Sequence, residues 1–150
     1  REQTVEMQRL ATAAGPRATE RVTIRRMPGL EHSSTSYSIA MVIEHVAIVN
    51  RDIASLLATL VAGKPWDRVV STADYKPQGL MAVSHALDRL GEANTDLERI
   101  LSDCGAIRAA TGTHAHPWFG ELPASIWACF PGFHGAIHLK QARAISVGLR

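Results

Sequence analysis

The sequence has 150 residues, of which 46% are hydrophobic and 20% are charged, so it has enough apolar material for a folded core and is not a disordered chain. The formal net charge of +2 argues against a polyanion as partner, and the aromatic content of 5% leaves little for stacking on nucleic-acid bases. No apolar run approaches the roughly 20 residues that a membrane-spanning helix needs. We therefore expect one domain over residues 1–150, with neither a nucleic acid nor a membrane as its partner.

The cysteine content indicates the compartment. Cys104 and Cys129 are the two cysteines of the chain, too few for a disulfide framework. They fit a reducing cytosol, where a buried thiol behaves as a small hydrophobic group, and Cys129 is expected in the core. The predicted location is cytoplasmic.

Two helical stretches are predicted in the first half of the chain. The first covers about Glu2 to Ala14 and stops at Gly15-Pro16, a pair that breaks helices. Residues Thr19 to Ile24 fit either a short helix or an extended segment. The clearest stretch runs from about Ser36 to Ala62, where apolar residues recur at three- and four-residue steps and Gly63 follows as a terminator.

The second half predicts two more helices. A connection from Lys64 to Gln78 leads into a helical stretch over about Leu80 to Ser102. Residues Asp103 to Leu122 are predicted to be irregular, and the last helix covers about Pro123 to Val147. Pro131 lies inside that helix and should kink it or split it in two. Four helical stretches in one domain favour an all-α four-helix bundle with long inter-helix loops.

Two imidazoles in the last stretch, those of His134 and His138, are predicted to face the same way. They are four residues apart, so on a helix they project within roughly 40° of each other and lie one turn, about 6 Å, apart. One metal ion can accept both nitrogens. Such a pair also arises by chance, and two hydrogen-bonded histidines on a helix surface are the alternative. Gly135 stands where a zinc protease would carry its glutamate, which disfavours protease function.

His45 strengthens the case for a metal site. It falls in the most hydrophobic stretch, on the face shared by Met41, Val42 and Val49. An unsatisfied buried polar group costs about 1–3 kcal/mol, so a core histidine needs partners. A lone histidine satisfied by a carbonyl is the plain alternative. Together with the pair on the last helix, three imidazoles and an open fourth position are typical of a catalytic metal site.

Three segments, taken in order, resemble the DinB-like and YfiT-like metal-binding four-helix bundles. They are 38–45 (SIAMVIEH), 116–122 (HPWFGEL) and 133–141 (FHGAIHLKQ). The separation of the first and last segments also matches the family, and the resemblance covers about residues 1–148. Gly135 departs from the pattern, because relatives often carry glutamate at this position.

The resemblance implies one divalent ion, nickel or zinc, held by His45, His134 and His138, in a protein that forms homodimers. Family members include transferases that use small thiols such as bacillithiol or mycothiol, and a thiol-dependent maleylpyruvate isomerase. The expected function is a metal-dependent transferase or isomerase-like enzyme that activates a thiol or water toward an electrophilic small molecule. A bound cation makes such a nucleophile by lowering the pKa of its ligand.

Two polar residues near the histidines have open roles. Gln141 follows His138 by three residues and is either a donor that orients this ligand or a plain surface amide. Asp52 lies about 10 Å from His45 along the helix, too far to bind the same ion. It is expected to make a hydrogen bond within the bundle or to contact substrate.

The remaining histidines are expected to lie outside the metal site. His116 precedes Pro117 and is expected at the rim of a pocket, although loop polarity alone accounts for the pair His114 and His116. His85 is expected to be structural, and His32 to be exposed.

Three hypotheses about function follow. A metal-dependent thiol transferase predicts a concave pocket with an open position at the ion. A non-enzymatic metal-binding or stress-related module, whose ion is structural, predicts closed coordination and no pocket. An ordinary helical interaction protein with three unrelated histidines predicts no bound ion.

Overall fold

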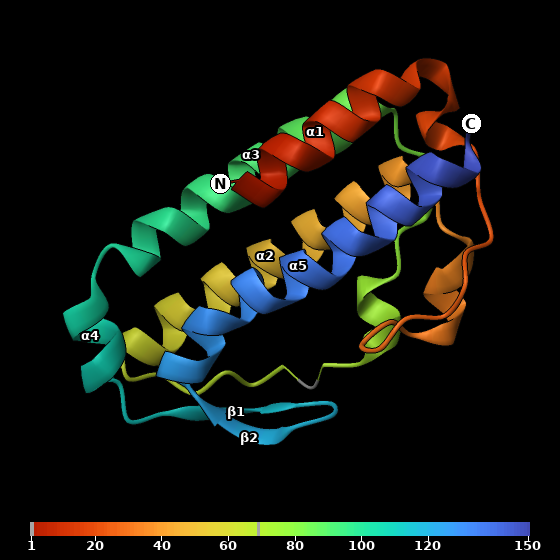
Figure 1. Ribbon diagram of the computed structural model, residues 1–150. Coiled ribbons are helices and arrows are strands. Elements are labelled where there is room, and N and C mark those ends of the chain that lie inside the picture. Colours follow the sequence, from red (N-terminus) through yellow and green to blue (C-terminus); the bar gives the residue numbers. More distant parts are fainter. Residues whose placement is uncertain (1, 69) are drawn as a thin grey trace.

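The computed structural model describes residues 2–68 and 70–150. In chain order its helices and strands are α1 (Glu2–Ala14), α2 (Ile39–Val61), α3 (Val83–Leu101), α4 (Cys104–Ala109), β1 (Thr113–His116), β2 (Gly120–Pro123) and α5 (Ala124–Gly148). Short 3₁₀ helices occupy Gly15–Thr19, His32–Ser36 and Thr72–Tyr75. Figure 1 shows the four long helices in two layers, α1 beside α3 and α2 beside α5. Within the described part of the chain, no helix combines the length and the apolar character needed to span a membrane.

The central helix is α2, which packs against both α3 and α5. It begins after Ser38, whose side-chain oxygen accepts a hydrogen bond from the N–H of Met41 and so caps the helix. Fifteen of its 23 residues are buried. A helix that is apolar around most of its circumference belongs in a core.

The core has two parts, one toward each end of the bundle. Ile43 and Leu90 lie in the first part, where α1, α2, α3 and α5 meet. Leu57 and Trp127 lie in the second part, where α2 and α5 meet α4 and the end of α3. Along α5, the segment that carries His134 and His138 lies between these two parts. The histidines therefore lie midway along the bundle, between the two parts of the core.

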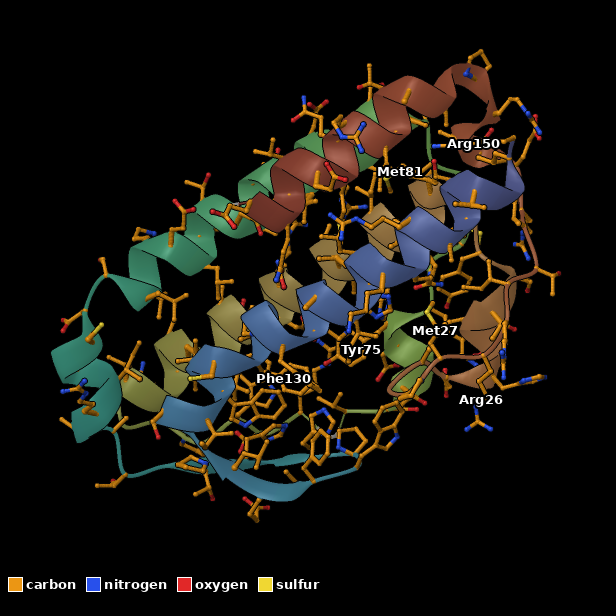
Figure 2. The ribbon with its side chains drawn as sticks, in the orientation of Figure 1. Arg26, Met27, Tyr75, Met81, Phe130 and Arg150 are labelled. Atoms are coloured by element: carbon orange, nitrogen blue, oxygen red, sulfur yellow. The ribbon has the colours of Figure 1, made fainter. Side chains whose placement is uncertain are left out.

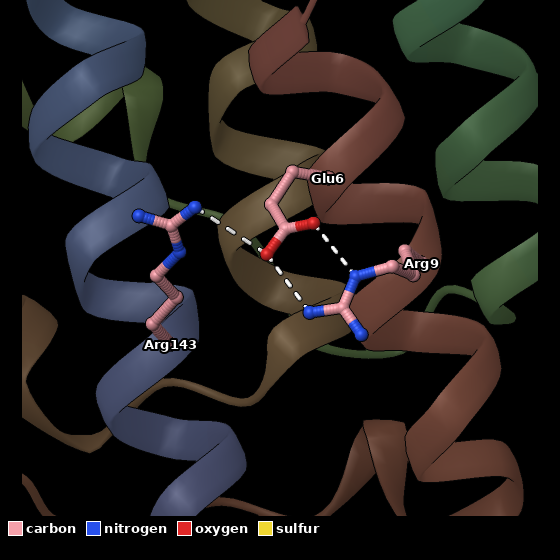
Figure 3. A network of polar contacts seen from close by, with 3 residues as sticks. All are labelled: Glu6, Arg9 and Arg143. Carbon is pink, nitrogen blue, oxygen red and sulfur yellow. Dashed lines mark hydrogen bonds and ion pairs between the residues drawn. The ribbon is translucent and has the colours of Figure 1, made fainter.

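A surface network joins α1 to α5 (Figure 3). The Glu6 carboxylate accepts hydrogen bonds from Arg9 at 2.7 Å, on its own helix, and from Arg143 at 3.4 Å, on α5. The hydrogen bond from Arg9 is the main reason that the pKa of Glu6 falls to about 2. Exposed ion pairs contribute little to stability, so the apolar core, and not this network, is what holds the two helices together.

The predicted fold class, an all-α four-helix bundle with long connections, is confirmed, and the helix boundaries agree with the predicted ones to within a few residues. The connection from Lys64 to Gln78 contains the 3₁₀ helix Thr72–Tyr75. Between Thr19 and Ile24 the chain is extended after the 3₁₀ turn ends, because Val22 and Ile24 donate backbone hydrogen bonds to Tyr37 and Thr35.

The prediction of an irregular segment over residues 103–122 is wrong. This segment contains the short helix α4 and the antiparallel hairpin β1–β2, in which Thr113 pairs with Pro123 and His116 with Gly120. Gly120 has a φ of 70°, a conformation that glycine adopts without strain, so the chain can reverse there.

Of the two effects predicted for Pro131, a kink or a split in the last helix, the split does not occur, because α5 runs without a break from Ala124 to Gly148. The ring of Pro131 is buried, so tertiary packing supports the turn that lacks one backbone hydrogen bond. The prediction that Cys129 lies in the core is wrong, because its side chain is exposed. Cys104 is exposed as well. Cys129 lies two residues after the inward-facing Trp127, so it points away from the bundle.

Candidate metal centre

His45 on α2 meets His134 and His138 on α5, across the contact between the two helices. One ring nitrogen from each histidine lies within 4.8 Å of the others. The closest pair is Nε2 of His45 and Nε2 of His134, at 3.2 Å. The structure thus brings together three imidazoles that are far apart in the sequence, in a group that could hold a metal ion.

The outer nitrogen of His45 has a fixed partner. Its Nδ1 lies 2.7 Å from the backbone carbonyl oxygen of Tyr75. A carbonyl oxygen can only accept, so Nδ1 must carry the hydrogen and donate it. In the neutral ring Nε2 then has a free lone pair, which points toward His134 and His138.

Gln141 fixes His138 in the same way. The side-chain N–H of Gln141 donates to the backbone carbonyl of Ser34 at 2.7 Å, which sets the orientation of the amide. Its oxygen therefore faces Nδ1 of His138, at 2.6 Å, and accepts the hydrogen from it. Gln141 is fully buried, so it is not a surface amide. The lone pair of His138 is left on Nε2.

His134 is the histidine whose partners are incomplete. Its Nδ1 is buried without a hydrogen-bond partner among the described residues, and Phe130 stacks on its ring at a centroid distance of 5.7 Å. Two nitrogens bound at about 2.0–2.1 Å to a tetrahedral zinc ion lie roughly 3.3 Å apart. The 3.2 Å separation between His45 and His134 fits this spacing. Without an ion, the same separation suits a hydrogen bond from His134 to the lone pair of His45.

All three imidazoles are held in the neutral form. Burial is the largest cause in each case: it lowers the pKa of His45, it lowers the pKa of His134 well below 6.5, and it lowers the pKa of His138 to about 3. The neighbouring histidines add to the effect for His134 and His138. Since a metal ion binds only the unprotonated nitrogen, the donor set suits a divalent cation at neutral pH.

The histidines open onto a pocket of about 120 Å³. Aromatic side chains line much of it, and Figure 2 shows their rings gathered between the first half of α5 and the hairpin, around Phe130. Charged residues Glu31 and Lys76 also line the pocket. The three histidines therefore adjoin a mainly apolar pocket.

His116 is among the residues that line this pocket. Its Nδ1 accepts a hydrogen bond from the backbone N–H of Trp118 at 3.0 Å, so the neutral ring carries its proton on Nε2. Its ring also contacts Phe119 and Phe130, at centroid distances of 4.7 and 4.8 Å. His116 therefore contributes a hydrogen-bond donor within an aromatic wall.

The other polar candidates lie outside the three-histidine group. Asp52 accepts hydrogen bonds from the hydroxyl of Tyr75 and from Arg68. His114 packs against Trp127, and His85 and His32 are exposed. Sequence reasoning missed Tyr75 and Ser34, which act through backbone carbonyls that any residue carries.

The fold and the site together define a class of protein, a mostly helical four-helix bundle with a buried three-histidine group that could hold a metal ion. The chain is similar to TT2238, a four-helix bundle protein of known crystal structure, with a TM-score of 0.57 and 23% identity over 95% of this chain and 94% of that chain. This likeness shows the fold. No protein-family model matches the chain, and no curated protein matches it.

Proposed function

We propose that His45, His134 and His138 hold one divalent ion, nickel or zinc, and that the protein is a DinB-like metal-dependent transferase that uses a small thiol. One observation carries the proposal: two neutral histidines have their outer nitrogens bonded to oxygen acceptors, so their free nitrogens converge with His134 at a pocket. A ligand histidine whose other nitrogen is held in this way is oriented before the ion arrives.

The pocket favours an enzyme over a module with a structural ion. A structural site is closed by four protein ligands, whereas a catalytic site keeps one position for substrate. Here the described residues supply a group of three histidines and a mainly apolar opening beside them. When bound, the ion would lower the pKa of a thiol or water and so supply an anionic nucleophile near neutral pH.

The chain's own residues would bind and orient the reactants. The aromatic wall around Phe130 would keep water from the thiolate and hold the apolar part of an electrophilic substrate. His116 would donate its Nε2–H to an oxygen of that substrate, because its Nδ1 is already an acceptor for Trp118.

Metal analysis of protein purified without a histidine tag tests the metal site. We expect about one ion per chain in the wild type and loss of that ion in His45→Ala and His138→Ala, because each variant removes one of three ligands. His85→Ala is the matched control, since His85 is an exposed histidine on α3, and it should keep the ion. A wild type without stoichiometric metal would overturn the proposal.

A screen of small thiols against electrophilic substrates tests the activity. Turnover that requires both the thiol and the ion supports the transferase. A bound ion without any such turnover would identify the alternative, a metal-binding module. Light scattering of the same sample tests the homodimer that we propose with this function.

A further inference from the structure

The segment that follows α2 returns to touch the histidine site. Tyr75, at the end of the 3₁₀ helix Thr72–Tyr75, lies on the side of α2 and α5 that faces away from α1 and α3 (Figure 2). Its backbone carbonyl accepts the hydrogen bond from Nδ1 of His45. The last carbonyls of a helix have no partner inside the helix, so this one is free to serve the histidine.

The side chain of the same tyrosine is anchored separately. Its hydroxyl donates to Oδ2 of Asp52 at 3.0 Å, and Arg68 donates to the same oxygen at 2.7 Å. A carboxylate oxygen can only accept, so the Tyr75 hydroxyl is the donor in this pair. Asp52 lies on α2, as His45 does, so both ends of Tyr75 are bonded to one rigid helix.

A second carboxylate on α2 holds the chain just beyond Tyr75. Glu44 is buried, and its two oxygens accept the backbone N–H groups of Gln78 and Gly79 at 3.2 and 3.3 Å. The carbonyl of Tyr75 is thus placed between two points where the segment is attached to α2. If this carbonyl moved away from His45, hydrogen bonds to the carboxylates of Asp52 and Glu44 would have to break. Hydrogen bonds to charged groups are stronger than those between neutral groups.

We infer that Asp52 is a positioning residue for the metal site, acting through Tyr75. By anchoring the hydroxyl, Asp52 places the carbonyl that keeps the hydrogen of His45 on Nδ1 and leaves the lone pair on Nε2. This inference rests on the proposed metal site and adds a residue outside the ligand set to it. Of the two roles expected for Asp52, a hydrogen bond within the bundle or a contact with substrate, the inference uses the first.

The test compares variants of the full chain for their affinity for Co²⁺, measured by competition with a chelator and by the visible absorption of the bound ion. Asp52→Ala and Tyr75→Phe should each weaken binding about 10–100-fold, the usual cost of removing a group that orients a ligand. Both should also change the Co²⁺ spectrum. Asp52→Asn keeps a neutral acceptor for the hydroxyl and should lose less.

Arg51→Gln is the matched control. Arg51 neighbours Asp52 on α2 and forms an ion pair with Glu92 on α3, away from the segment that contains Tyr75. This variant should keep the wild-type affinity and spectrum, and thermal melting confirms that every variant is folded. Wild-type affinity and spectrum in both Asp52→Ala and Tyr75→Phe would overturn the inference.

A readout without metal separates this inference from the proposed function. In ¹⁵N-labelled metal-free protein, NMR identifies which nitrogen of His45 carries the hydrogen. We expect Nδ1–H in the wild type and a mixture of both tautomers in Asp52→Ala. If the wild type binds no Co²⁺, the proposed function fails, and this measurement still decides whether Asp52 sets the tautomer of His45. An unchanged tautomer in Asp52→Ala would contradict that role.

Discussion

Gln141 connects two parts of the chain that are 107 residues apart, since its amide joins the ring of His138 to the backbone of Ser34. Gln141→Leu should leave the Nδ1–H of His138 and the carbonyl of Ser34 without partners in the core. Each such group costs about 1–3 kcal/mol, so the free energy of unfolding should fall by that order, as urea denaturation of the metal-free protein will measure.

The same change at an exposed position supplies the control. Gln8 lies on the outer surface of α1, and Gln8→Leu should leave the free energy of unfolding nearly unchanged. Affinity for metal should fall in Gln141→Leu alone. Equal stability of the two variants would show that the buried amide bridge contributes nothing.

At the level of single residues, the sequence predicts the three histidines of the site better than the groups that form hydrogen bonds with them. His134 and His138 are recognisable from helical spacing, and His45 from its place on an apolar stripe. Tyr75 is not recognisable, because its carbonyl is an atom that every residue has, and only the path of the folded chain brings it to His45. The prediction that Cys129 is buried relied on residue type and is wrong. Its position on the helix, and not the apolar character of a thiol, decides which side of α5 it occupies.

Among the elements, α5 contains the least favourable residue for its conformation. Pro131 has no N–H to offer the carbonyl of Trp127, one turn earlier, and a proline inside a helix costs about 3 kcal/mol. Pro131→Ala restores this hydrogen bond and should raise the free energy of unfolding. The gain should be about 1–3 kcal/mol, reduced by the greater freedom of the unfolded chain.

Pro123→Ala is the comparison for this prediction. Pro123 precedes the first turn of α5, where the missing N–H has no helical partner to lose, and the variant has the same effect on the unfolded chain. The difference between the melting temperatures of the two variants measures the contribution of the restored backbone hydrogen bond. A lower melting temperature for Pro131→Ala than for Pro123→Ala would contradict the explanation.

The long helices were predictable and the hairpin was not, for a physical reason. The apolar spacing of α2 extends over many turns, so the predicted range of Ser36 to Ala62 is close to the observed Ile39–Val61. Strands β1 and β2 have four residues each, too few to show a period, and an isolated hairpin is only marginally stable. Trp127 on α5 holds this one by donating to the carbonyl of His114 at 3.2 Å.

The stability of the whole molecule should depend steeply on pH when no metal is bound. Burial lowers the pKa of each histidine of the site in the folded state, whereas in the unfolded chain they take up protons below about pH 6.5, the usual pKa. Because the unfolded state then binds more protons, the free energy of unfolding falls as the pH falls, by up to about 1.4 kcal/mol per pH unit for each histidine.

This contribution is complete above pH 6.5 and is lost as the pH drops toward the folded pKa, which for His138 is about 3. Urea midpoints at pH 7, 6 and 5, with a chelator present, will give the slope. His138→Gln removes one titrating group and should flatten the slope, whereas Gln8→Leu, at an exposed position without a titratable group, should leave the slope unchanged. Identical slopes in all three proteins would place the acid sensitivity elsewhere.

The two helices that carry the three histidines of the site are made at different times. During synthesis on the ribosome, α2 is complete while the residues of α5 have still to be added, and its single histidine is a poor chelator by itself. Only when α5 docks do the second and third imidazoles arrive. In the proposed metal site, capture of the ion would therefore mark the moment at which the bundle closes, because a nascent or truncated chain that lacks α5 offers one of the three imidazoles of the site.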